Sequence, residues 1–229
     1  MTKLMSRRTA IKTGGIAMLG SLLTPSIALG NENKIALDQA PSPTCIFTVE
    51  TPSGKTIFRS EEPGESSIGQ DAKGNDYTIR RKTSITQNGN ETVSSSCRTE
   101  LIRSSANQGR SVGSVTENDE IYAYVQIEVT YSLSGESIKV PKAVGTVRSR
   151  ASYASVQHRS MTASQGIIGS FCKEAVFTTE SHTITTGWPY CPYQPTLNSM
   201  YMHLNGGECI GQFYVSGMGE QIIHAEWTI

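Results

Sequence analysis

The sequence lacks the long apolar runs and the one-sided charge that are typical of membrane-spanning and nucleic-acid-binding chains. Aromatic residues make up 7% of the 229 residues, and acidic and basic residues are equal at 20 each. The apolar stretch near the start, residues 14–23, is too short to cross a bilayer as a helix. We therefore expect no stable membrane insertion of the folded domain. Without an excess of positive charge, we also expect no binding to nucleic acid.

The motifs of common metal sites are also missing, and the common motif of serine hydrolases is matched only in a predicted loop. The chain has no Cys-x-x-Cys and no His-x-x-x-His, the patterns in which closely paired metal ligands usually occur. One run, Gly109-Arg110-Ser111-Val112-Gly113, matches Gly-x-Ser-x-Gly, but it lies within the glycine- and serine-rich residues 104–119, which have the composition of a loop. In hydrolases this motif lies at a turn between a strand and a helix. The sequence therefore gives no catalytic, cofactor-binding or metal-binding residue, predicts no cofactor and argues against an enzyme. Two alternatives stay open: a serine triad assembled from distant residues, and a metal site on neighbouring strands built from Cys191, His203, Cys209 and His224.

The first 30 residues have the layout of a signal peptide. A basic start precedes the short apolar run, and the small residues Ala28 and Gly30 lie just before a plausible cleavage point. Removing this segment would leave 199 residues. The segment holds four of the 20 basic residues and none of the 20 acidic ones, so the remainder has 16 basic and 20 acidic residues and a net charge of −4.

Part of this segment resembles the twin-arginine export motif through Ser6, Arg7, Arg8 and Lys12. It departs from the motif at Ala10, where the family favours phenylalanine. The resemblance implies a bacterial or archaeal source and folding before export. It also implies recognition by the export machinery and a final location that is secreted or on the cell-envelope exterior. The alternatives are a general secretory signal with two arginines and an uncleaved signal-anchor.

The most regular stretch is Ile121–Leu133, in which apolar and more polar positions alternate. Its even positions include Tyr122 and Tyr124, so we predict a strand with a dry face and a wetter face that carries both tyrosines. Gly135 then predicts a hairpin turn. Pro141 cannot donate to a ladder, so the returning strand is expected to end there or to lie on an edge.

The rest of the chain supports the same fold class. The last predicted strand places Ile223, Ala225, Trp227 and Ile229 on one face, whereas residues 60–76 have the composition of a long polar loop. Roughly ten short strands with glycine-rich turns predict an all-β fold, a single antiparallel β-sandwich or barrel. The expected organisation is a signal peptide at 1–30, a polar linker at 31–44 and one β domain at 45–229.

Five cysteines follow the predicted signal: Cys45, Cys97, Cys172, Cys191 and Cys209. An exported protein reaches compartments where disulfides persist, and an odd count leaves at least one cysteine without an intrachain partner. Two bridges among five cysteines can be drawn in 15 ways, as pair counting shows. We expect one or two bridges, with the last three cysteines supplying at least one of them.

Candidate ligand-binding residues lie in a proline-rich loop: Trp188, Tyr190 and Tyr193. Aromatic rings on a stiff loop can stack on a sugar or anchor a protein. The alternative is that Trp188 plugs one end of the core and the tyrosines cover it. The domain loosely resembles small secreted β-domains of Gram-positive bacteria that carry no assigned activity, through its tyrosine-rich strand and the glycine turn after it. We therefore predict a non-catalytic domain that binds a surface glycan or protein; the alternatives are a small secreted hydrolase and a metal- or redox-dependent secreted protein.

Overall fold

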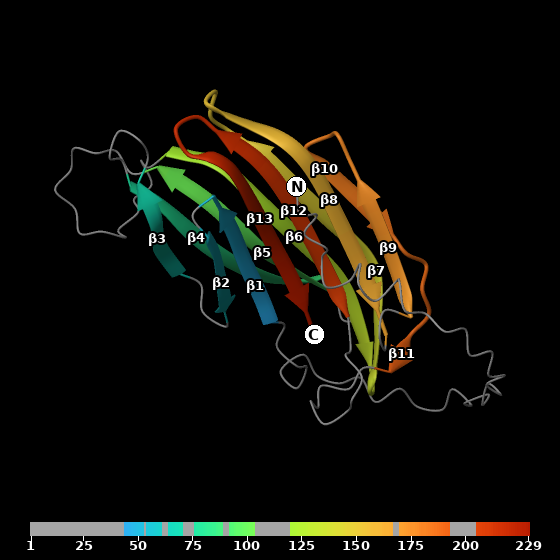
Figure 1. Cartoon of the computed structure of the whole chain (residues 1–229). Helices are drawn as coiled ribbons and strands as arrows, with labels where there is room; N and C mark the ends of the chain where they lie inside the picture. The colour runs from blue at the N-terminus through green and yellow to red at the C-terminus, as the bar shows by residue number, and fades with distance from the viewer. Residues whose placement is uncertain are drawn as a thin grey trace. The chain divides into compact units, whose positions relative to one another are not determined.

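The computed structural model describes residues 44–52, 54–60, 64–70, 76–88, 92–103, 120–166, 170–192 and 205–229. These residues form thirteen strands and no helix, so none of them belongs to a helix long and apolar enough to span a membrane. The strands build two antiparallel sheets packed face to face (Figure 1). The all-β prediction is therefore confirmed, as a sandwich. The predicted signal peptide, and the predicted linker up to residue 43, lie outside the described residues.

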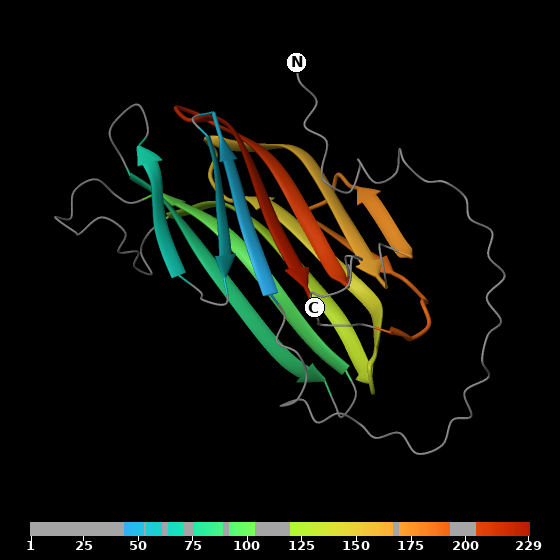
Figure 2. The same cartoon turned by 60° about the horizontal axis from the view of Figure 1, so that its bottom comes forward.

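Sheet A has the strand order β2-β1-β13-β12-β8-β9, which Figure 2 shows running from the blue strands to orange β9. Its strands are β1 (Thr44–Thr51), β2 (Gly54–Ser60), β8 (Ala154–Gln165), β9 (Phe171–Val176), β12 (Gly206–Val215) and β13 (Gly219–Thr228). The alternation predicted for the last strand is confirmed: Ile223, Ala225 and Trp227 point inward and are fully buried.

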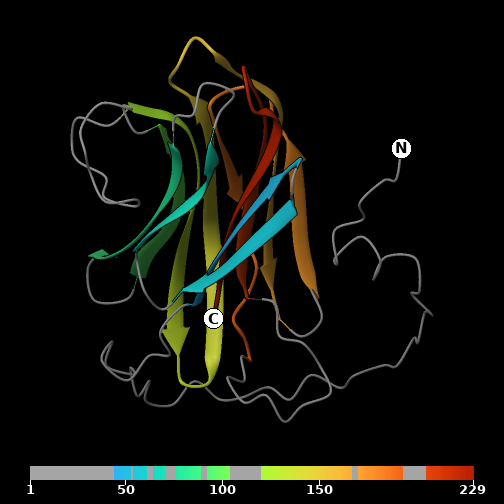
Figure 3. The same cartoon turned by 60° about the vertical axis from the view of Figure 1, so that its left-hand side comes forward.

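Sheet B has the strand order β10-β7-β6-β5-β4-β3, and the short strand β11 also pairs with β7. Its strands are β3 (Gly64–Gln70), β4 (Asp76–Asn88), β5 (Thr92–Arg103), β6 (Glu120–Ser134), β7 (Ser137–Ser149), β10 (Ser181–Thr185) and β11 (Cys191–Pro192). Figure 3 shows the green strands of sheet B and the red strands of sheet A as separate layers. The prediction of a loop at 60–76 is wrong in part, because residues 64–70 form the edge strand β3.

The central strand and its hairpin are confirmed. In β6 the odd-numbered residues Val125, Ile127 and Val129 face sheet A and are fully buried. The strand turns into β7 at Gly135, which has the left-handed φ of 54° that a residue without a Cβ adopts most easily.

Two expectations about this hairpin are wrong because each falls on a β-bulge. The β5–β6 register shifts at Tyr122, so Tyr122 turns into the core while Tyr124 stays on the outer face. The β6–β7 register shifts beside Pro141, and β7 continues to Ser149. A bulge leaves a residue outside the regular ladder, so it accommodates a proline within a paired strand.

The two sheets approach each other closely through small residues. A Cβ added to Gly211 of β12 would lie 2.6 Å from Val147 Cγ1 of β7 and 2.8 Å from Val125 Cγ2 of β6. A disulfide between Cys45 of β1 and Cys97 of β5 joins the sheets covalently. The prediction that the last three cysteines supply a bridge is wrong, since Cys172, Cys191 and Cys209 form no disulfide with one another. Cys209 instead fills the buried core as a thiol.

Candidate functional site

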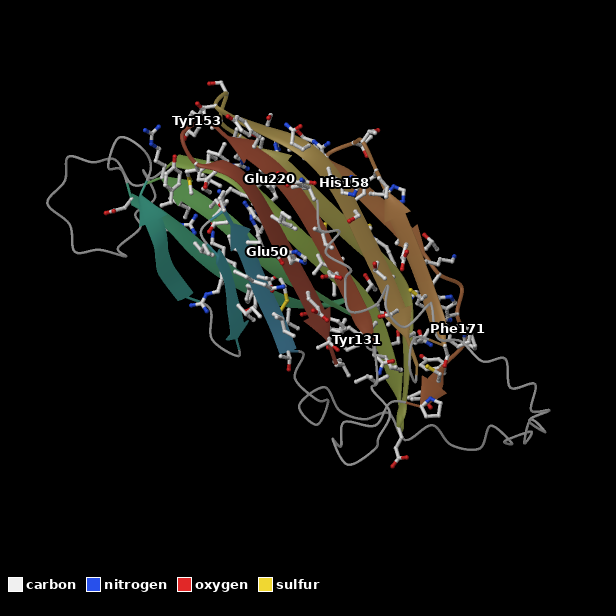
Figure 4. All side chains as sticks on the ribbon, viewed as in Figure 1. Glu50, Tyr131, Tyr153, His158, Phe171 and Glu220 are labelled. Atoms are coloured by element: carbon white, nitrogen blue, oxygen red, sulfur yellow. A yellow bond between two sulfur atoms is a disulfide. The ribbon has the colours of Figure 1, made fainter. Side chains whose placement is uncertain are left out.

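The predicted aromatic loop is tied into the end of the sandwich. Trp188 is only 8% exposed and packs against Phe171, the residue labelled on β9 in Figure 4, with ring centroids 5.8 Å apart. Tyr190 is 46% exposed and lies beneath Lys139, whose Nζ is 5.8 Å from the ring centroid. Tyr193 lies outside the described residues. Of the two described rings, that of Tyr190 is therefore the one that is open to solvent.

A buried glutamine fixes this loop. Gln165 accepts a hydrogen bond from Val140 N at 2.6 Å and donates one to Pro189 O at 2.6 Å. It also donates to Cys191 Sγ at 3.1 Å. Burial raises the pKa of the Cys191 thiol, and the hydrogen bond from Gln165 opposes that rise in part. The contacts match the structural alternative, in which the tryptophan closes one end of the core.

The predicted metal ligands do not converge. Cys209 pairs with Ala225 and points into the core, while the next pair along, Ile210 and His224, points outward. Cys209 and His224 therefore lie on opposite faces of sheet A. His203 lies outside the described residues, and within the described part of the chain no three His, Cys, Asp or Glu side chains are grouped as metal ligands.

His224 instead joins a charged cluster on the outer face of sheet A. Its Nδ1 is 3.0 Å from Glu208 Oε1, and its Nε2 is 3.9 Å from Glu50 Oε1. Glu50 Oε1 also forms an ion pair with Lys55 Nζ, 2.9 Å away. Since this side is open to solvent, such pairs contribute little to stability.

The outer face of sheet B, which points away from sheet A, carries an array of hydroxyl groups. We call it the hydroxyl face. Strand alternation places on it Ser and Thr residues of β4, β5, β6, β7 and β10, among them Ser84, Thr86, Ser94, Ser96, Thr130, Thr146, Ser181, Thr183 and Thr185. The strands hold these side chains in rows, because each residue lies opposite its partner on the next strand.

Two neighbouring rows form the centre of this face. The first row crosses β4, β5 and β6 as Ser84, Ser96 and Glu128. The second row crosses the same strands as Thr86, Ser94 and Thr130. The two hydroxyls Ser84 Oγ and Ser96 Oγ are 2.8 Å apart, and Ser94 Oγ is 3.2 Å from Thr130 Oγ1. Hydrogen bonds between neighbouring strands therefore set the positions of these groups.

A shallow depression lies over these rows. Its volume is about 190 Å³, and it is lined by Ser84, Thr86, Ser94, Ser96 and Glu128. Each hydroxyl both donates and accepts hydrogen bonds, and the carboxylate of Glu128 accepts them. The arrangement can hold a small polar group that offers donors and acceptors of its own.

Basic groups border the depression. Lys82 and Arg98 form the next row, and beyond them the Glu100 carboxylate is only 1% exposed. Arg80 Nε lies 2.5 Å from one Glu100 oxygen and Arg98 Nη2 lies 2.7 Å from the other. Arg98 also covers the Tyr124 ring, 3.8 Å from its centroid. These contacts fix the arginines in place beside the hydroxyl rows.

The hydroxyl face was not predicted from the sequence. The alternating Ser and Thr residues of β4 and β5 are visible in the sequence, but polar side chains on alternate strand positions also suit any solvated sheet face. Their significance depends on which strands are adjacent. Comparison of the chain with protein-family models, with curated proteins and with solved structures found no match.

Proposed function

We propose that this protein is an exported, non-catalytic domain that binds a carbohydrate on the hydroxyl face of sheet B. The depression lined by four hydroxyls and one carboxylate carries the proposal. Sugars present the same kind of group, a hydroxyl that donates and accepts, so the two surfaces can exchange hydrogen bonds in both directions.

The position of these groups on a sheet supports binding. Side chains on paired strands lose little further freedom when a ligand arrives, so less of the interaction energy is spent on ordering the site. The hydroxyl face is centred on β4, β5 and β6, and the disulfide holds β5 to sheet A.

Export is the second part of the proposal. It is supported by the resemblance of residues 6–12 to a twin-arginine signal and by the disulfide, which is compatible with an oxidising compartment. A carbohydrate ligand would then come from the cell surface or the medium.

The test is a binding screen against immobilised polysaccharides with two matched double variants. Ser84→Ala with Thr86→Val removes two hydroxyls of the depression while keeping the branched shape at Thr86. Ser160→Ala with Thr162→Val makes the same changes on the outer face of sheet A, where both residues lie on β8. We expect the first pair to weaken binding by about tenfold, since each lost hydrogen bond contributes about 0.5–1.5 kcal/mol.

The control pair should bind like the unchanged protein, and both pairs should keep its urea midpoint. Equal loss in the two double variants, or binding that neither of them changes, would place the ligand elsewhere and contradict the proposal.

A further inference from the structure

The outer faces of the two sheets carry opposite charge. Among the side chains that the structure describes, the outer face of sheet A has one basic group, Lys55, and five carboxylates: Glu50, Glu174, Glu208, Glu220 and Glu226. Figure 4 labels Glu50 and Glu220 on this sheet. The count gives the face a net charge of −4 with histidines neutral.

The hydroxyl face of sheet B has the reverse balance. Its described strand carboxylates are Asp76, Glu100 and Glu128, and Glu180, just before β10, lies 3.4 Å from Arg148. Its six basic groups are Arg80, Lys82, Arg98, Lys139, Lys142 and Arg148. Six basic groups and four carboxylates give a net charge of +2. A chain whose sequence is balanced overall therefore concentrates positive charge on the face that holds the depression.

The basic groups lie on both sides of the hydroxyl rows. Lys82 of β4 lies one row before Ser84, and Lys142 of β7 lies opposite Thr130 in the second row. Side chains two residues apart on one face of a strand are separated by about 7 Å. A ligand that fills the depression therefore lies within reach of both lysines.

Carboxylates of the protein neutralise only part of this charge. Glu100 is the shared partner of Arg80, Arg98 and Lys82, whose Nζ lies 3.6 Å away, so one negative group serves three positive ones. Lys82 is still 51% exposed. Lys142 is exposed, and no ion pair in the described part of the chain involves it.

We infer that the ligand of the hydroxyl face is a polysaccharide that carries anionic groups, carboxylate or sulfate. This inference depends on the proposed function. Lysine and arginine form stronger hydrogen bonds with anions than neutral groups form with each other. The acidic outer face of sheet A repels the same ligand, so the charge distribution directs the polymer to sheet B.

The test compares three soluble polymers with the full exported protein: polygalacturonate for carboxylate, dextran sulfate for sulfate, and unmodified dextran as the neutral probe. We expect at least one anionic polymer to bind at least tenfold more tightly than dextran. Its affinity should fall several-fold when the salt concentration rises from about 50 to about 500 mM, since salt screens exposed charges. The polymer that binds more tightly identifies the anionic group.

Matched variants locate the charge effect. Lys82→Gln combined with Lys142→Gln should weaken binding of the preferred anionic polymer by about tenfold, while Lys55→Gln on the other face should leave it unchanged. Glu128→Gln should tighten anionic binding and leave dextran unaffected, because it removes a negative charge from the depression. The urea midpoint of each variant checks that the fold is intact.

Two outcomes would overturn the inference in distinguishable ways. If dextran binds as tightly as the anionic polymers and the Ser84→Ala, Thr86→Val protein still loses affinity, the proposed function stands and the anionic ligand is wrong. If a single-stranded DNA oligonucleotide displaces the anionic polymer and the hydroxyl variant binds normally, the face attracts any polyanion and the carbohydrate is wrong. Absence of binding to all three polymers contradicts both proposals.

Discussion

Reduction of the Cys45–Cys97 disulfide should remove a large part of the stability of the sandwich. The bridge joins residues 52 positions apart in the sequence. In the chain-entropy account, closing a loop of that length restricts the unfolded chain by about 4 kcal/mol at 25 °C. With a urea dependence of about 2 kcal/mol per molar, the unfolding midpoint should fall by about 2 M. Circular dichroism of a urea titration, with and without reductant, measures the change.

A free cysteine of the same core serves as the control. Cys209→Ala removes a buried thiol and leaves the bridge, so reductant should still lower the midpoint of this variant by about 2 M. In the Cys45→Ala, Cys97→Ala protein, reductant should have no effect. If the oxidised and reduced forms of the unchanged protein unfold at the same urea concentration, the bridge does not stabilise the fold by constraining the unfolded chain.

Two further predictions concern the contact between the sheets. Gly211→Ala should lower the free energy of unfolding by about 1–3 kcal/mol, because the added Cβ would overlap Val147 and Val125. Gln212 points outward from the same strand, so Gln212→Ala should change the free energy of unfolding by no more than about 0.5 kcal/mol. Equal changes in the two variants would refute the predicted overlap. Burial raises the pKa of the Cys209 thiol, so the unfolded chain loses that proton at a lower pH than the folded protein does. Stability is then retained below about pH 8 and falls above about pH 8.5 by up to about 1.4 kcal/mol per pH unit. Urea titrations at several pH values measure this slope, and Cys209→Ala should reduce it; an unchanged slope would contradict the assignment.

Local patterns predicted the strands better than their faces. The alternation of β6 and β13 fixed which side chains enter the core, because a strand repeats every two residues. The same pattern failed at Tyr122 and beside Pro141, where bulges shift the register. A bulge arises from the pairing of two strands, so neither strand's own sequence reveals it.

Long-range pairing also explains what the sequence did not show about the site. Cys45 meets Cys97 because β1 and β5 face each other across the sandwich, and nothing near either cysteine specifies that contact. The depression likewise needs β6 beside β5, which brings Glu128 to the hydroxyl rows. Trp188 could have served either as a ligand platform or as part of the core, and its packing against Phe171 distinguishes the two only in three dimensions.

The central claim is that the outer face of sheet B is the ligand face. The most direct measurement is a titration of the isotope-labelled protein with polygalacturonate fragments, followed by backbone amide chemical shifts. We predict that the largest shifts cluster on β4, β5, β6 and β7 around the residues that line the depression. Shifts that cluster on β12 and β13, around the acidic outer face of sheet A, would contradict it.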